Sequence, residues 1–175
     1  MSFLLPLSYF LSGLFMKISD DEYDVKGNKL YSLIFGLVCA VFAAYATVTN
    51  ADAAYIFIAI LIGNFIALKV DGLHHIITLI FFVIICFIFG IPDISIWILI
   101  ICILAAFFDE IGHDKIGNFV ENKYVNLFFE YRCVMKVVIL LLAIFGVFDL
   151  WTFIFFILFE CGYELAGLIF SKLNQ

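Results

Sequence analysis

The sequence predicts an all-α fold: a polytopic bundle of about seven transmembrane helices, forming a single domain over residues 1–175. Composition is the first observation behind this prediction. The chain is 66% hydrophobic with a mean hydropathy of +1.21, whereas soluble domains are about 45–50% apolar. The second observation is the length of the uncharged runs. The run 30–48 is long enough to cross a bilayer, and shorter runs such as 76–90 can cross a thinner one.

Each expected helix follows from an apolar run between turn residues. Residues 1–16 lack the basic segment of a signal peptide and lead directly into acidic residues, so we interpret them as a retained first helix. Short turns join later runs into hairpins. Two turns, FGIPDISIW (89–97) and FGVFDLW (145–151), are alike and indicate internal two-helix repeats, although Gly, Pro and Asp are also ordinary turn residues. From the N-terminus, the expected helices are 2–17, 30–48, 53–70, 76–90, 94–108, 134–148 and 151–170.

The charge distribution predicts the orientation. The nine Lys and Arg residues gather in four places, and the turns 47–52, 90–93 and 146–149 contain none. The positive-inside rule therefore places the charged loops on the cytoplasmic side. We expect an integral protein of a prokaryotic plasma membrane, in contact with membrane lipids and without a nucleic-acid partner.

Carboxylates and histidines gather at the predicted cytoplasmic ends of three helices. The segments are KISDDEYD (17–24), KVDGLHH (69–75) and DEIGHD (109–114). Residues four apart share a helix face, and such pairs are Asp20/Asp24, Asp71/His75, Asp109/His113 and Glu110/Asp114. Mg²⁺ takes carboxylate oxygens together with phosphates and water, so we predict that these acids meet in one cytoplasmic-side cavity. The histidines also suit another divalent cation, such as a transition metal.

Glu160 and Glu164 stand inside the last apolar run. If that helix starts near Trp151, Glu160 lies about 14 Å deep, near mid-bilayer. An ionisable group at that depth is expected to face the bundle interior and to mark a functional site.

Two motifs resemble those of the UbiA family of intramembrane prenyltransferases. Asp20-Asp21-x-x-Asp24-x-x-x-Asn28 follows Gly13 and resembles the family's first motif, Asn-Asp-x-x-Asp-x-x-x-Asp, with the outer two residues exchanged. Glu110-Ile-Gly-His-Asp114, followed by Gly117, resembles the second motif, Asp-x-x-x-Asp. Four helices separate the motifs, as in the family. The chain would be a short version that lacks the family's first helix and one at the end.

The resemblance implies a Mg²⁺-dependent transferase that acts on a prenyl diphosphate at the cytoplasmic face. One Mg²⁺ would be held by the first motif and a second by Glu110 and Asp114. We add basic residues near the motifs as contacts to the diphosphate. The candidate catalytic residues are Asp24, Asp114, Lys69, Arg132 and Lys136. The candidate metal ligands are Asp20, Asp21, Asp24, Asn28, Asp71, His75, Asp109, Glu110, His113, Asp114, Glu160 and Glu164.

Two other functions remain open at this point. A divalent metal-ion transporter or metal-binding membrane protein would use His75, His113, Glu160 and Glu164, and this hypothesis explains Glu160 better than the transferase does. A lipid-headgroup phosphotransferase would begin its motif with Asp-Gly, as Asp71-Gly72 does, but the Ala-Arg that should follow is missing.

Overall fold

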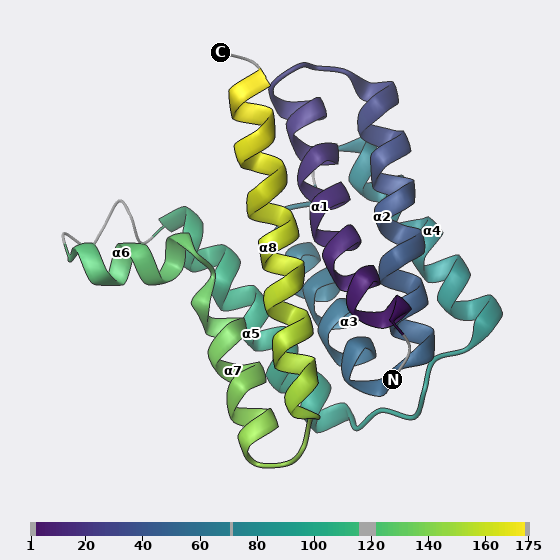
Figure 1. Ribbon diagram of the computed structural model, residues 1–175, viewed down its shortest axis with the longest axis vertical. Helices are drawn as coiled ribbons and strands as arrows, with labels where there is room; N and C mark the ends of the chain where they lie inside the picture. Colours follow the sequence, from purple (N-terminus) through teal and green to yellow (C-terminus); the bar gives the residue numbers. More distant parts are fainter. Residues whose placement is uncertain (1–2, 71, 116–121, 174–175) are drawn as a thin grey trace. The chain divides into compact units, whose positions relative to one another are not determined.

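The computed structural model describes residues 3–70, 72–115 and 122–173, and most of these residues are helical, with no β-strand among them. The predicted all-α fold is therefore confirmed for the described part of the chain (Figure 1). The helices are α1 (Leu4–Asp24), α2 (Lys29–Thr49), α3 (Ala51–Ile66), α4 (Leu73–Phe89), α5 (Ile96–Lys115), α6 (Lys123–Glu130), α7 (Cys133–Ile144) and α8 (Leu150–Leu173).

Fewer helices could span a membrane than the seven that we predicted. Each predicted run has a helical counterpart, but only three helices in the described residues are long and apolar enough to cross: α2, α5 and α8. The helices α3, α4 and α7 are apolar but have 16, 17 and 12 residues. At about 1.5 Å per residue, α7 would extend through little more than half of the hydrocarbon layer. Helix α1 has charged residues throughout its last two turns, so its apolar part is shorter than the helix itself.

Helix α1 continues well beyond residue 17, where we predicted its end. The acidic residues 20–24 are therefore part of a helix. Two ion pairs four residues apart support this extension: Lys17 Nζ lies 2.8 Å from Asp21 Oδ1, and Lys26 Nζ lies 2.8 Å from Glu22 Oε1. The chain then turns at Gly27, whose φ of +64° favours glycine.

The chain divides into two compact units. The first contains α1, α2, α4 and α8 from Ile154 onward, and the second contains α3, α5, α6, α7 and the first residues of α8. The single domain over 1–175 stays a prediction.

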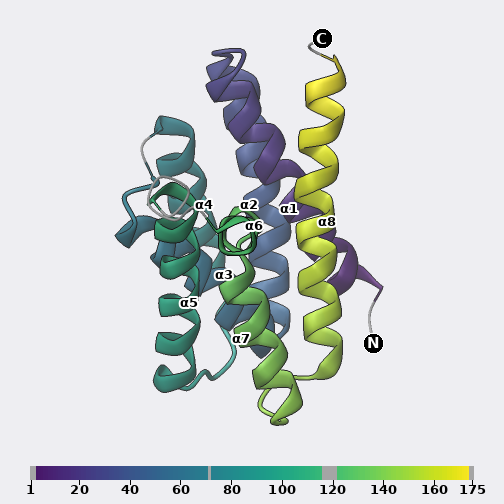
Figure 2. The same ribbon diagram turned by 90° about the vertical axis from the view of Figure 1, so that its left-hand side faces the viewer.

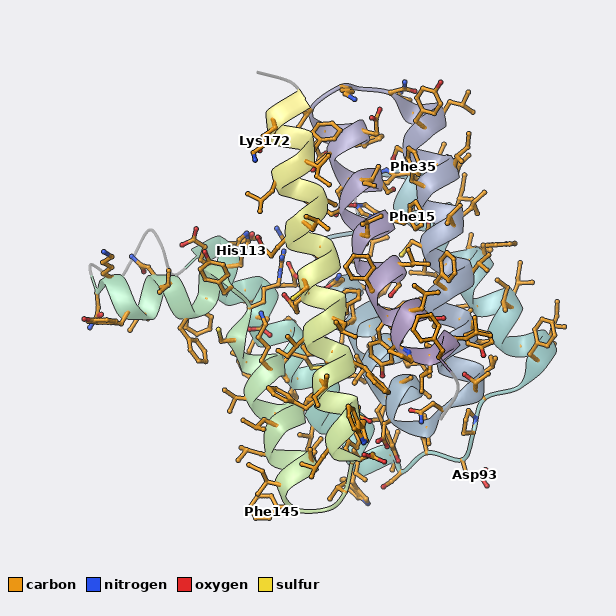
Figure 3. All side chains as sticks on the ribbon, viewed as in Figure 1. Phe15, Phe35, Asp93, His113, Phe145 and Lys172 are labelled. Carbon is orange, nitrogen blue, oxygen red and sulfur yellow. The ribbon has the colours of Figure 1, made fainter. Side chains whose placement is uncertain are left out.

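In the first unit, α1 packs between α2 and α8. Phe15 of α1 stacks on Phe35 of α2 with ring centroids 5.9 Å apart (Figure 3). Against α8, a Cβ added to Gly13 would meet the carbonyl oxygen of Phe159, and one added to Gly162 would meet that of Phe10. Because glycine has no side chain, the two backbones approach closely, as in many membrane helix pairs.

In the second unit, α5 contacts α3, α6 and α7. A Cβ on Gly63 of α3 would lie 2.7 Å from the side chain of Ala106 of α5, so these helices also pack closely. Asp52 in the first turn of α3 accepts hydrogen bonds from Asp149 N (2.8 Å) and Thr152 Oγ1 (2.7 Å). Asp52 thereby joins α3 to the turn between α7 and α8.

The two similar turns share a backbone feature. Gly90 and Gly146 have φ values of +76° and +71°, a region that other residues rarely adopt. Gly146 also ends α7 at Ile144, four residues earlier than we predicted. Asp93 and Phe145 mark these turns in Figure 3. Internal repeats stay a prediction.

Candidate metal centre

Two adjacent histidines lie in the first turn of α4. The helix begins after Gly72, which has an extended backbone (φ −99°, ψ +149°). One turn after His74, Thr78 packs against α2 at Gly36, where an added Cβ would collide with its hydroxyl oxygen. Gly36 therefore lets α4 approach α2 closely and fixes the position of His74 and His75 in the first unit.

Asp20 of α1 faces both histidines. Its Oδ1 lies 3.7 Å from His75 Nε2 and 4.0 Å from His74 Nε2. One ligand atom from each of the three residues can be chosen such that all lie within 4.8 Å of one another. His74 is 4% exposed, while Asp20 and His75 are partly exposed. One member of the cluster is thus buried, and the other two are partly accessible to solvent.

Aromatic packing holds the imidazole of His74. The ring of Tyr23 stacks on it at a centroid distance of 4.2 Å, and the ring of His75 lies 3.9 Å away on centroids. A Cβ on Gly72 would lie 2.5 Å from Cε1 and Nδ1 of His74. Glycine at position 72 thus leaves the space that this ring occupies. Side chains held by their neighbours bind ligands with less loss of conformational freedom.

The donor set and its spacing suit a transition-metal ion. Zinc is bound at about 2.0–2.1 Å by His and carboxylate ligands, which sets neighbouring ligand atoms about 3.4 Å apart in a tetrahedral site. The distances of 3.7 and 4.0 Å lie close to that value. The positive end of the α4 dipole favours a negatively charged group such as a carboxylate nearby.

His74 is absent from our predicted ligands. The prediction used pairs four residues apart, and neighbouring residues in a helix do not usually face the same way. In the structure, His74 and His75 stand at the helix start, and both rings reach Asp20. The doublet of histidines that follows Gly72-Leu73 is the sequence signal that could have identified it.

The other predicted ligands of the first motif lie outside this cluster. Asp21 is paired with Lys17, and Asp24 is exposed at the end of α1. Asn28 is the N-cap of α2 and accepts a hydrogen bond from Tyr31 N at 3.3 Å. Asp71 lies outside the described residues. An Mg²⁺ ion held by this motif stays a prediction.

The second motif lies beside basic side chains in the second unit. Glu110 is 7% exposed and accepts hydrogen bonds from Arg132 Nε (2.9 Å) and Nη2 (3.5 Å). Asp114 is paired with Lys69 at 2.6 Å. Two of the predicted diphosphate contacts, Lys69 and Arg132, thus lie directly beside the two acids of this motif.

Asp109 and its neighbours have other surroundings. Asp109 is 2% exposed and accepts hydrogen bonds from Val134 N (2.8 Å) and Met135 N (2.7 Å). Its carboxylate thus provides acceptors for backbone N–H groups in the first turn of α7, which have no partner within the helix. His113 is exposed near the end of α5 (Figure 3). Lys136 donates a hydrogen bond to the Tyr131 carbonyl.

The two glutamates of α8 differ in exposure. Glu160 is half-buried and Glu164 is exposed. Neither belongs to the group formed by Asp20, His74 and His75. Their predicted position near the middle of a bilayer stays a prediction.

The predicted single cavity involves both units. Asp20 and Asp24 belong to the first unit, whereas Asp109 and Asp114 belong to the second, so their convergence stays a prediction. Comparisons of the chain with protein-family models, curated proteins and solved structures find no match. The resemblance to the UbiA family therefore rests on the two motifs alone.

Proposed function

We propose that this chain is an integral membrane protein that binds a divalent transition-metal ion through Asp20, His74 and His75. One observation carries the proposal: two imidazoles and a carboxylate offer ligand atoms within 4.8 Å of one another. The acid comes from α1 and the histidines from α4. A bound ion would therefore connect two helices that are far apart in the sequence.

Membrane insertion is supported by three apolar helices, although the site itself lies on α1 and α4. Helix α2, which lies beside α1 and α4, is long and apolar enough to cross a bilayer, as are α5 and α8. Large apolar side chains such as Val41 of α2, Leu104 of α5 and Leu168 of α8 are exposed, which is favourable in lipid and unfavourable in water. The positive-inside rule favours a cytoplasmic location for the basic loops.

The donor set favours a transition metal over Mg²⁺. Imidazole suits Zn²⁺, Fe²⁺, Ni²⁺ and Cu²⁺, whereas Mg²⁺ is usually held by oxygen ligands. The competing explanation is structural: in it, Asp20 is the partner of a histidine side chain and stabilises the packing of α1 on α4. The two explanations differ in one respect, because only the first requires affinity for a metal ion.

Metal titration of the purified protein in detergent tests the proposal. We expect one Co²⁺ or Zn²⁺ per chain, and His75→Ala should weaken binding by at least about 100-fold, since removal of even an outer-shell partner costs 10–100-fold. His113→Ala is the matched control, because His113 lies on α5 outside the cluster. Equal losses in the two variants, or no binding by the wild type, would reject the proposal.

A Mg²⁺-dependent prenyl diphosphate transferase is the second candidate. The observation that favours it is the pairing of Glu110 with Arg132 and of Asp114 with Lys69. A metal-bridged diphosphate needs carboxylates for the metal and basic groups for the phosphate oxygens. On binding, the metal would take the place of the basic partner of each carboxylate, and the phosphate oxygens would take the place of the acidic partner of each basic group. The same titration is repeated with Mg²⁺ in the presence of a prenyl diphosphate. Loss of Mg²⁺ binding in Asp114→Asn, with binding retained in His75→Ala, would favour this function.

A further inference from the structure

Helix α6 (Lys123–Glu130) is amphipathic, and its apolar side is largely exposed. At about 100° per residue, Lys123 and Glu130 fall on one side of the helix. Tyr124, Leu127 and Phe128 fall on another, and all three are exposed, Tyr124 to 83%. No residue of α6 is buried. The short helix lies between α5 and α7 and has no long apolar run, which is why no helix was predicted there.

The side chain of Phe129 packs α6 against α5 of the second unit. A Cβ on Gly112 of α5 would collide with the ring of Phe129, so this ring lies directly on the α5 backbone. Asn122 begins the helix by accepting a hydrogen bond from Tyr124 N at 2.9 Å. At the other end, Arg132 adopts a left-handed conformation (φ +45°, ψ +55°) and turns the chain into α7. Both ends of α6 are therefore defined by local structure.

The direction of α6 differs from that of its neighbours. In Figure 1, α6 runs across the view while α5 and α7 run along it, and in Figure 2 α6 is seen along its axis. A helix at right angles to spanning helices, with an apolar and a charged side, has the properties of a helix that lies in the membrane–water interface. Tyr124 and Tyr131, both exposed, are of the residue type enriched at that level.

We propose that α6 lies in the interfacial region of the bilayer, with Tyr124, Leu127 and Phe128 directed towards the acyl chains. The exposed apolar side of α6 is thus covered by lipid. The apolar surface continues onto α7, where Val137, Leu140 and Leu141 are exposed. Lys123 is the first residue of α6, and Lys136 lies in the first turn of α7, where its ammonium donates to the carbonyl of Tyr131 next to the end of α6; at an interface both would lie at the level of the headgroups. The inference rests on the membrane location proposed above.

Single tryptophans measure the depth of each side of α6. The two native tryptophans, Trp97 and Trp151, are first replaced by phenylalanine. Phe128→Trp then reports the apolar side and Glu130→Trp, as a matched control, the charged side. In phosphatidylcholine vesicles with bromine near the headgroup end of the acyl chains, we expect at least about twofold stronger quenching of the tryptophan at position 128 than of that at 130. Aqueous acrylamide should show the reverse order.

A third variant separates this inference from the membrane location itself. Leu140→Trp lies on the exposed face of α7 and should be quenched by bromine deep in the acyl chains. If it is quenched while position 128 is accessible to acrylamide, α6 is solvated and the inference is wrong. If position 128 is shielded from both quenchers, a protein surface covers α6 and the inference is again wrong. Absence of lipid quenching at position 140 would overturn the membrane location and the inference together.

Discussion

Saturating Zn²⁺ should stabilise the wild-type chain, and this stabilisation should disappear in His74→Ala. A ligand that binds only the folded state at 100 times its dissociation constant adds about 2.7 kcal/mol to the free energy of unfolding. His74 is the most buried member of the cluster, and its ring is held by Tyr23 and His75. The measurement is the change in melting temperature between Zn²⁺ and a chelator, in detergent.

This prediction concerns the change in melting temperature that Zn²⁺ causes, and not the melting temperature of each variant without metal. His74→Ala also removes a buried ring, so the variant is expected to melt earlier without metal. His113→Ala is the control and should keep the full effect of Zn²⁺, because His113 is exposed and lies outside the cluster. A Zn²⁺ effect of wild-type size in His74→Ala would contradict the assignment.

Removal of Arg132 should destabilise the second unit strongly. In Arg132→Met, the carboxylate of Glu110, a residue that is 7% exposed, loses the guanidinium that donates to both of its oxygens. Breaking a buried ion pair from one side typically costs roughly 3–5 kcal/mol, and the partial exposure of Arg132 favours the lower end of that range. Methionine retains an apolar stem of similar length, so the lost charge is the main change. Denaturant titration in detergent measures the effect.

A double variant distinguishes the charge from the packing. Glu110→Gln combined with Arg132→Met leaves no unpaired carboxylate, so it should be more stable than Arg132→Met alone. If the double variant is as unstable as the sum of the two single variants, the ion pair is not the cause of the loss. Lys69→Met is a useful comparison, since the Lys69–Asp114 pair is more exposed and exposed pairs contribute about 0–1 kcal/mol.

The helices were predictable wherever one apolar run ended at clear turn residues. The run at 30–48 differs from α2 (Lys29–Thr49) by one residue at each end, because Asn28 and Asn50 flank an uninterrupted apolar segment. The ends of α1 and α5 were predicted too early, because charged residues were interpreted as the start of loops. In fact Asp, Glu and Lys are compatible with a helix, and pairs such as Lys17–Asp21 support it.

The candidate site was predictable only in part. Asp20 and His75 were among the predicted ligands, but their meeting depends on how α4 packs on α2 and α1, which hydropathy does not determine. The closeness of that packing depends on Gly36 and Thr78, whose contact joins residues far apart in the sequence. His74 was not among the predicted ligands, because no acidic residue lies four positions from it in the sequence.

An X-ray absorption spectrum of the protein with one equivalent of Zn²⁺ tests the metal centre directly. We expect nitrogen and oxygen ligands at about 2.0–2.1 Å, with the outer-shell scattering of two imidazoles. One imidazole should be lost in His75→Ala and none in His113→Ala. A sulfur shell at about 2.3 Å, arising from the chain's five cysteines, or a spectrum without imidazole scattering, would contradict a metal centre formed by Asp20, His74 and His75.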